Sequence, residues 1–150
     1  MQKYKVLFVC VHNSARSQMA EALLKTLAWD RFDAESAGLE PGKLNPLVVA
    51  VMKEVGIDIS ENRTKSIFDF FKQGRRYHYV IAVCDQAQAQ KCPVFPGVKQ
   101  TFNWSFPDPA GFSGTYEEKL DKTRQVRDAI KAKIEEWLTN VKMEGNNGND

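Results

Sequence analysis

The residues best suited to chemistry are a cysteine and an arginine with five residues between them, in the stretch Cys10-Val-His-Asn-Ser-Ala-Arg16. A cysteine supplies a nucleophilic sulfur once it ionises, and an arginine supplies a planar fork of donors that grips two oxygens of a tetrahedral anion. The positive charge that binds such an anion also favours the thiolate over the thiol. This pair therefore predicts a site at which the sulfur attacks a bound oxyanion.

The segments on either side of this pair are those that such a site needs. Four apolar residues, Val6 to Val9, predict a buried strand that ends at Cys10, and the apolar residues from Ser17 to Ala28 recur with helical spacing. The backbone N–H groups of a short loop that enters a helix lack partners, and the helix dipole adds positive potential there. We therefore expect an oxyanion-binding loop made of Val11, His12, Asn13, Ser14, Ala15 and Arg16.

Two side chains of this stretch have more specific expected roles. Ser17 can donate a hydrogen bond to the sulfur of Cys10, and Asn13 is a residue type that tolerates the left-handed backbone of such a loop. The simpler alternative is that Cys10 is only a small buried hydrophobe at the end of a strand. The strand before the motif and the amphipathic helix after it favour the oxyanion site.

Length and composition bound the kind of protein. A chain of 150 residues, 43% hydrophobic and 27% charged, suits one soluble globular domain with a sizeable core. The net charge of +2 without a basic stripe argues against a nucleic-acid partner, and no segment approaches the length of a membrane span. The apolar run near the N-terminus is too short for a signal sequence, so we expect a cytoplasmic protein. In that reducing compartment, three cysteines are expected to be free, catalytic or redox-active.

Strands and helices alternate along the rest of the chain. Further strands are expected over 33–38, 78–84 and within 98–104, and further helices over 46–55, 67–71 and 116–141. Asn45 before Pro46, and Thr115 three residues before Glu118, are helix-start signals. The alternation predicts an α/β fold with a parallel sheet that has helices on both faces. We predict a single catalytic domain over residues 1–142 and a disordered tail over 143–150.

The motif from Cys10 to Arg16 resembles the low-molecular-weight protein tyrosine phosphatase superfamily. Its continuation, Arg16-Ser-Gln-Met-Ala-Glu21, is more similar to the thioredoxin-coupled arsenate reductases, since the phosphatases usually have Pro where Gln18 stands. The resemblance covers the chain up to about Val141 and implies a four-stranded sheet in the order 2-1-3-4.

The resemblance also assigns an acid. Asp108, followed by Pro109, matches the Asp-Pro general acid of the family, which protonates the departing oxygen. From the residues alone, the same dipeptide is an ordinary turn. The family match favours the general acid.

Two cysteines, Cys84 and Cys92, remain to be explained. Seven residues separate them, too many for a local CxxC motif, and two remote histidines do not complete a zinc site. From the residues alone, they are a buried thiol at a strand end and an unrelated loop thiol. The resemblance implies a relay instead: Cys84 attacks Cys10, Cys92 then moves the disulfide to Cys84–Cys92, and thioredoxin or a similar dithiol reduces it.

The predicted function is therefore the reduction of arsenate to arsenite, with no cofactor and no bound metal. The main alternative is a low-molecular-weight phosphatase acting on phosphotyrosine or on small aryl or acyl phosphates, in which Cys10 forms a phosphocysteine and Asp108 activates water. Ala110-Gly111 stands where the tyrosine phosphatases typically have aromatic residues, which weakens that alternative. A third candidate is a non-catalytic oxyanion-binding redox sensor, and the intact set of Cys10, Arg16 and Asp108 argues against it.

Overall fold

A four-stranded parallel sheet forms the centre of the computed structural model, which describes residues 3–141. The strands are β1 (Tyr4–Cys10), β2 (Phe32–Gly38), β3 (Tyr79–Ala82) and β4 (Gln100–Asn103). They pair in the order β2-β1-β3-β4, every pair being parallel, as the resemblance implied. The predicted tail lies outside the described residues, so the division into a domain and a tail stays a prediction.

The helices alternate with the strands as the periodicity indicated. They are α1 (Arg16–Ala28), α2 (Pro46–Glu54), α3 (Ile67–Lys72), α4 (Gln86–Ala89) and α5 (Tyr116–Asn140), with a 3-10 turn η1 (Pro109–Gly111) before α5. Asn45 caps α2 through its side chain, with Pro46 in the first turn. Thr115 and Glu118 form the predicted capping box of α5, so both predicted helix starts are confirmed.

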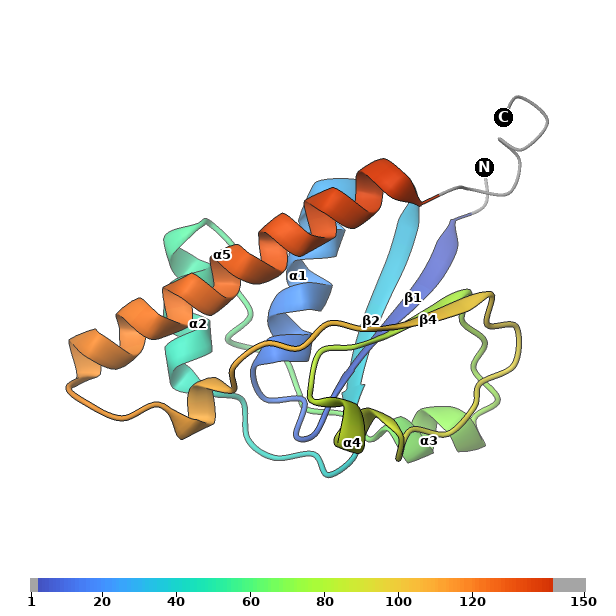
Figure 1. Ribbon diagram of the computed structural model, residues 1–150, viewed down its shortest axis with the longest axis horizontal. Coiled ribbons are helices and arrows are strands. Elements are labelled where there is room, and N and C mark those ends of the chain that lie inside the picture. Colours follow the sequence, from blue (N-terminus) through green and yellow to red (C-terminus); the bar gives the residue numbers. More distant parts are fainter. Residues whose placement is uncertain (1–2, 142–150) are drawn as a thin grey trace.

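Apolar side chains alternate between the two faces of the sheet and build two cores. In β1, Val6 and Phe8 belong to the larger core, whereas Leu7 and Val9 belong to the smaller one. Helices α1, α2 and α5 cover the larger core, and α3 covers the smaller one from the other side (Figure 1). Because both faces are covered, the β1 sequence is a continuous apolar run rather than an alternating one.

One predicted strand is too long. β3 ends at Ala82, not at Cys84, although the N–H of Val83 still donates to Val9 O at 2.8 Å, and the side-chain amide of Asn103 binds carbonyl groups at this end. Asn103 Nδ2 donates to the carbonyl oxygens of Ala82 at 3.2 Å and of Cys84 at 2.8 Å. Cys84 therefore follows the strand rather than ending it.

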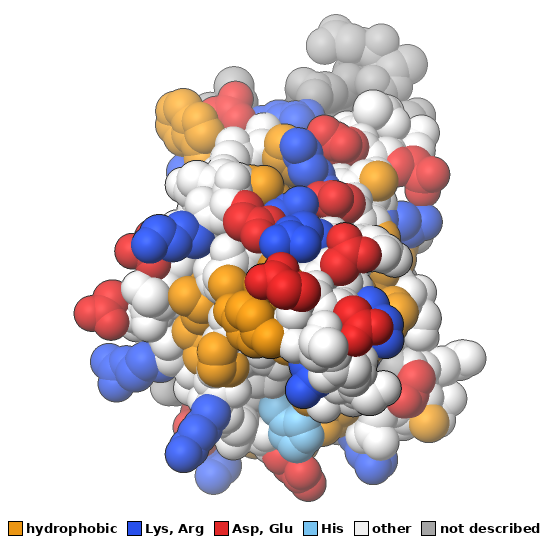
Figure 2. Space-filling view, turned by 90° about the vertical axis from the view of Figure 1, so that its left-hand side faces the viewer, with side chains coloured by type: hydrophobic (Ala, Val, Ile, Leu, Met, Phe, Trp, Pro, Cys, Tyr) orange, Lys and Arg blue, Asp and Glu red, His pale blue; other side chains and the backbone are white. Residues whose placement is uncertain are grey.

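The surface carries charges of both signs. Figure 2 shows one face on which acidic and basic side chains are interspersed around an apolar patch, without a basic stripe on that face. No helix within residues 3–141 is both long enough and apolar enough to cross a membrane.

Candidate active site

The loop between β1 and α1 turns its carbonyl groups outward. The carbonyl oxygens of Cys10, Val11, His12 and Ser14 accept from backbone N–H groups of residues 39–45, at 2.7 to 3.2 Å. A trans peptide places its N–H opposite its carbonyl, so the N–H groups of the following residues point into the loop. Such a convergence of N–H groups makes a nest of the kind that binds anions, and binding of an oxyanion here stays a prediction.

Two local features hold this loop against the sheet. Asn13 has a φ of 53°, the left-handed conformation that the residue type was expected to tolerate. Gly38, at the end of β2, lies so close beneath the loop that a Cβ atom there would be 2.7 Å from the nitrogen of Asn13. The helix that follows begins at Arg16 without a side-chain cap, which leaves its first N–H groups directed at the loop.

The sulfur of Cys10 is buried at the base of this nest and has two polar neighbours. The backbone N–H of Asn13 donates to Sγ at 3.0 Å, and the hydroxyl of Ser17 lies 2.8 Å from it. The N–H of Asn13 stabilises a negative charge on the sulfur, and the Ser17 hydroxyl adds to this when it donates. The expected contact between Ser17 and Cys10 is therefore present.

Arg16 and Asp108 meet at the rim of the nest. The guanidinium of Arg16 donates to the carbonyl oxygen of Phe106 at 3.2 Å, and its Nη2 lies 3.4 Å from the Asp108 carboxylate. Its Nε is buried and has no partner in the described part of the chain, so it remains available to an anion. Asp108 also caps η1 by accepting from the N–H of Ala110, which fixes the carboxylate beside the nest.

The sequence interpretation missed a buried amide that braces the loop from below. Gln18 is fully buried, and its Nε2 donates to both Asn13 O and Asn13 Oδ1 at 3.1 Å. Asn62, from a distant segment, donates to Gln18 Oε1 at 3.1 Å. The sequence did hold a signal for this brace: Gln18 stands where the phosphatases usually have Pro. A glutamine that is buried needs hydrogen-bond partners, which a proline does not.

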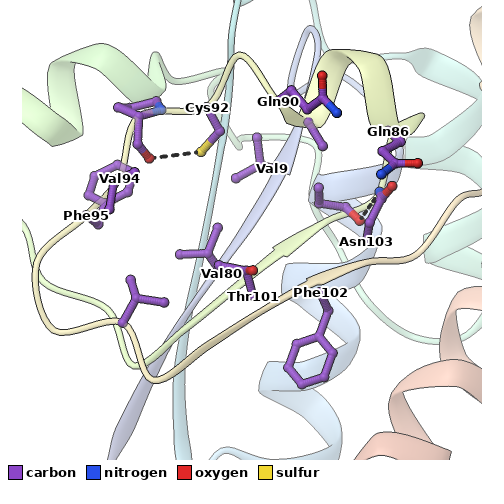
Figure 3. A pocket seen from close by; sticks show the side chains of 14 residues that line it. Val9, Val80, Gln86, Gln90, Cys92, Val94, Phe95, Thr101, Phe102 and Asn103 are labelled. Carbon is purple, nitrogen blue, oxygen red and sulfur yellow. Dashed lines mark hydrogen bonds between the residues drawn. The ribbon is translucent and has the colours of Figure 1, made fainter.

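The other two cysteines lie in sequence beyond β3. Both are free thiols; Cys84 is buried and Cys92 is half-buried. Cys92 borders a mostly apolar cavity of about 370 Å³ beneath the segment from Gln86 to Phe95, and its Sγ donates to the carbonyl oxygen of Pro93 at 3.4 Å (Figure 3). Asp85 caps the short helix α4 that connects the two cysteines.

Burial and neighbouring charges raise the pKa values of the other two thiols. Burial raises the pKa of Cys84, and the negative charge of Cys10 raises it further, while Arg16 acts in the opposite direction. Burial raises the pKa of Cys92 to about 11, and Cys84 adds to that rise. Cys84 is thus influenced by Cys10, and Cys92 by Cys84.

The structure therefore brings Cys10, Arg16, Ser17 and Asp108 together, with the loop N–H groups around them. The side chain of His12 is exposed, with its Nδ1 2.8 Å from the carbonyl oxygen of Glu40, outside the nest. Within residues 3–141, no three acidic, histidine or cysteine side chains are placed to hold a metal ion. The catalytic roles of these residues stay predictions.

Fold and sequence define the class of protein. The sequence profile described as low molecular weight phosphotyrosine protein phosphatase matches residues 5–147, and the chain belongs to this family. Within it, the chain is 42% identical over 134 residues to a protein named arsenate reductase from Halalkalibacterium halodurans, covering 89% of this chain and 94% of the relative.

Two solved structures give the same comparison in three dimensions. One, described as an arsenate reductase in the phosphate binding state, has a TM-score of 0.73 and 35% identity, covering 94% of this chain and all of that one. Another, described as a thioredoxin-dependent arsenate reductase of Corynebacterium glutamicum, has a TM-score of 0.61 and 28% identity, covering 90% of this chain and 63% of that one.

Proposed function

We propose that this protein is an arsenate reductase that uses a thioredoxin-like dithiol as its electron donor. The observation that carries the proposal is that two further free thiols, Cys84 and Cys92, follow β3, the strand that pairs with the one that ends at Cys10 in the oxyanion nest. A phosphatase mechanism needs the first thiol only, whereas a reductase must also supply two electrons. The arsenate reductases to which the chain is similar support the same assignment.

The first step is attack on arsenic. The inward N–H groups of the loop and the unpartnered Nε of Arg16 bind the arsenate oxygens, which places arsenic above the sulfur of Cys10. The thiolate forms a sulfur–arsenic bond while one arsenic–oxygen bond breaks. Asp108, held beside Arg16, gives its proton to the departing oxygen, which leaves as water.

The second step transfers the electrons. The sulfur of Cys84 attacks the sulfur of Cys10, a disulfide forms, and the electron pair of the broken sulfur–arsenic bond stays on arsenic. Arsenate is thereby reduced to arsenite, and two thiols are oxidised to one disulfide. Cys92 then attacks Cys84, which releases Cys10 as a thiolate and leaves a Cys84–Cys92 disulfide for the external dithiol.

A single-turnover experiment tests this proposal. The reduced protein is mixed with one equivalent of arsenate without reductant, and its disulfides are mapped by mass spectrometry. We expect one arsenite and one Cys84–Cys92 bridge per chain. Cys92→Ser should stop at a Cys10–Cys84 bridge, and Cys84→Ser should release no arsenite.

The opposite result would identify a phosphatase. If the protein hydrolyses an aryl phosphate equally well with Cys84→Ser and never forms arsenite, the proposal is wrong. The electron donor is tested separately by multiple turnover with thioredoxin and its reductase, against glutathione and glutaredoxin. Turnover with glutathione and glutaredoxin but not with thioredoxin would identify the glutathione system as the electron donor, and the proposed order of the three cysteines would be unchanged.

A further inference from the structure

Lys65 contacts the underside of the oxyanion loop, although it lies far from the loop in sequence. Its backbone N–H donates to Asn13 Oδ1 at 3.0 Å, and its carbonyl oxygen accepts from the N–H of Gly38 at 2.8 Å. Its ammonium lies 3.4 Å from Glu21 Oε1 and 3.3 Å from Ser36 Oγ. The residue therefore places one positive charge on a cluster of buried polar groups.

That cluster is a chain of hydrogen bonds that ends at the nucleophile. Ser36 Oγ donates to Glu21 Oε1 at 2.5 Å, and Asn13 Nδ2 lies 3.0 Å from Ser36 Oγ and 2.7 Å from Ser17 Oγ. Ser17 Oγ in turn lies 2.8 Å from the sulfur of Cys10. The three middle residues are fully buried, so water does not replace any of these bonds.

The direction of each hydrogen bond follows from the donors available. Asn13 Oδ1 accepts from Gln18 and from the N–H of Lys65, so the amide nitrogen of Asn13 must face the two serines and donate to both. Ser36 accepts from this amide and donates its own hydrogen bond to the Glu21 carboxylate. Ser17 likewise accepts from the amide, which leaves its proton for the sulfur of Cys10.

The carboxylate of Glu21 fixes the direction of the Ser36 hydrogen bond. An ionised carboxylate only accepts, so Ser36 must donate to it and can accept from Asn13. Glu21 is 7% exposed, and a buried carboxylate needs a paired cation. Lys65 is the cation placed on the oxygen that Ser36 also uses, and it contacts Ser36 directly.

We propose that Lys65 is a positioning residue: its ammonium keeps Glu21 as the acceptor for Ser36, and so holds Ser36 and Asn13 in place for the hydrogen bond that Ser17 donates to Cys10. The inference rests on the proposed function only in taking Cys10 as the nucleophile. Lys65 touches neither the sulfur nor the oxyanion, and it acts through Ser36 and Asn13.

Lys25 provides a matched control. Its ammonium lies 2.6 Å from the other oxygen of the same carboxylate, Glu21 Oε2, with 56% of its side chain exposed, against 31% for Lys65. It forms an ordinary helical pair four residues along α1. If neutralising Glu21 were all that mattered, the two lysines would be equivalent.

The experiment measures the reactivity of Cys10 without arsenate. Iodoacetamide alkylation at pH 7 is followed by mass spectrometry of the Cys10 peptide in Lys65→Met and in Lys25→Met. We expect Lys65→Met to slow alkylation about tenfold, the effect of one hydrogen bond to a charged group, and to lower kcat more than it raises KM. Lys25→Met should stay within about twofold of the wild type, because an exposed ion pair contributes little.

A double-mutant cycle separates the inference from simple loss of stability. Ser36→Ala breaks the link between Glu21 and Asn13, so adding Lys65→Met to it should slow alkylation no further.

Chemical rescue is a second test. In Lys65→Ala, propylammonium should restore the reactivity of Cys10 saturably, whereas tetramethylammonium at equal ionic strength should not, since it cannot donate a hydrogen bond. Additive effects, equal effects of both lysines, or failure of propylammonium would each overturn the role of Lys65. If the protein does not reduce arsenate but Lys65→Met still slows alkylation of Cys10 as expected, the proposed reductase activity is wrong and the role of Lys65 stands.

Discussion

At the scale of single residues, the three cysteines differ in what surrounds their sulfur atoms. Cys10 has the N–H of Asn13 and the hydroxyl of Ser17 within 3.0 Å, both able to stabilise a thiolate. Among the described residues, the partner of the Cys92 sulfur is the carbonyl oxygen of Pro93, which accepts a hydrogen bond from the thiol and stabilises its neutral form. The hydrogen bonds therefore favour the thiolate at Cys10, the proposed nucleophile, and the neutral thiol at Cys92, the last thiol of the proposed relay.

This contrast predicts how the reactivity of Cys92 depends on pH. Its pKa is raised to about 11, by burial first and by Cys84 second, so only a fraction on the order of 10⁻⁴ is thiolate at pH 7. Alkylation of Cys92 in the reduced protein should therefore be slow at pH 7 and rise about tenfold per pH unit up to pH 11. Peptide mass spectrometry over a pH series measures this.

A variant supplies the control for that prediction. Cys84→Ser removes the second cause of the raised pKa, so Cys92 should react somewhat faster at a given pH. Alkylation of Cys92 at pH 7 as fast as that of an unperturbed thiol, whose pKa is about 8.5, would contradict the prediction.

At the scale of elements, the catalytic loop takes its shape from β2 as well as from its own sequence. Residues 39–45, which continue from β2, donate the N–H groups that turn the loop carbonyls outward. Gly38 lets the loop lie directly on the end of the strand. The nest is therefore a property of two adjacent parallel strands and the helix between them.

Gly38→Ala tests this dependence. Its Cβ would lie 2.7 Å from both Asn13 N and Val11 O, which are backbone atoms that cannot move without opening the loop. We expect a loss of about 1–3 kcal/mol in the free energy of unfolding, measured by urea denaturation, and a loss of arsenate turnover of at least about tenfold.

Gly111→Ala is the matched substitution, because a Cβ there would have no neighbour within 4 Å. It should leave both the unfolding free energy and turnover close to the wild type. Equal behaviour of the two variants would show that the loop does not depend on close contact with β2.

At the scale of the whole molecule, the proposed relay connects the two cores: Cys10 and Cys84 belong to the larger core, whereas Cys92 packs against the smaller one. The large core, beneath α1, α2 and α5, holds β1 and the base of the nest rigid (Figure 1). The segment with α4 and Cys92 instead lies over a cavity, where few apolar contacts hold it. One side of the fold therefore fixes the nucleophile, and the other permits movement.

Hydrogen exchange tests that division. To bond with Cys84, Cys92 must leave Pro93, and a disulfide requires the two Cα atoms to lie within about 7 Å, so we expect the α4 turn between them to rearrange. After one turnover with arsenate, the amides of Ala89 and Cys92 should lose protection, since both now donate within this turn. Amides of β1 should not change.

The Cys92→Ser variant, treated identically, should keep the protection of Ala89, because its disulfide forms between Cys10 and Cys84 instead. Unchanged exchange over residues 85–96 in the oxidised wild type would mean that the relay closes without rearranging α4. Loss of protection throughout the chain would indicate general destabilisation instead.

The sequence alone determined the local framework of this protein. The apolar run before Cys10, the helical spacing after Arg16, and the caps at Asn45 and Thr115 act within a few residues, so pattern and capping chemistry predicted the elements. The resemblance predicted the strand order, which local patterns do not contain.

Only the tertiary structure decided how the loop is braced and where the sheet stops. Gln18 with Asn62, Lys65 with Glu21, and Asn103 with the Ala82 carbonyl pair residues far apart in the chain. Such pairings depend on which buried donors find which buried acceptors once the segments are packed, and residue spacing carries no record of that.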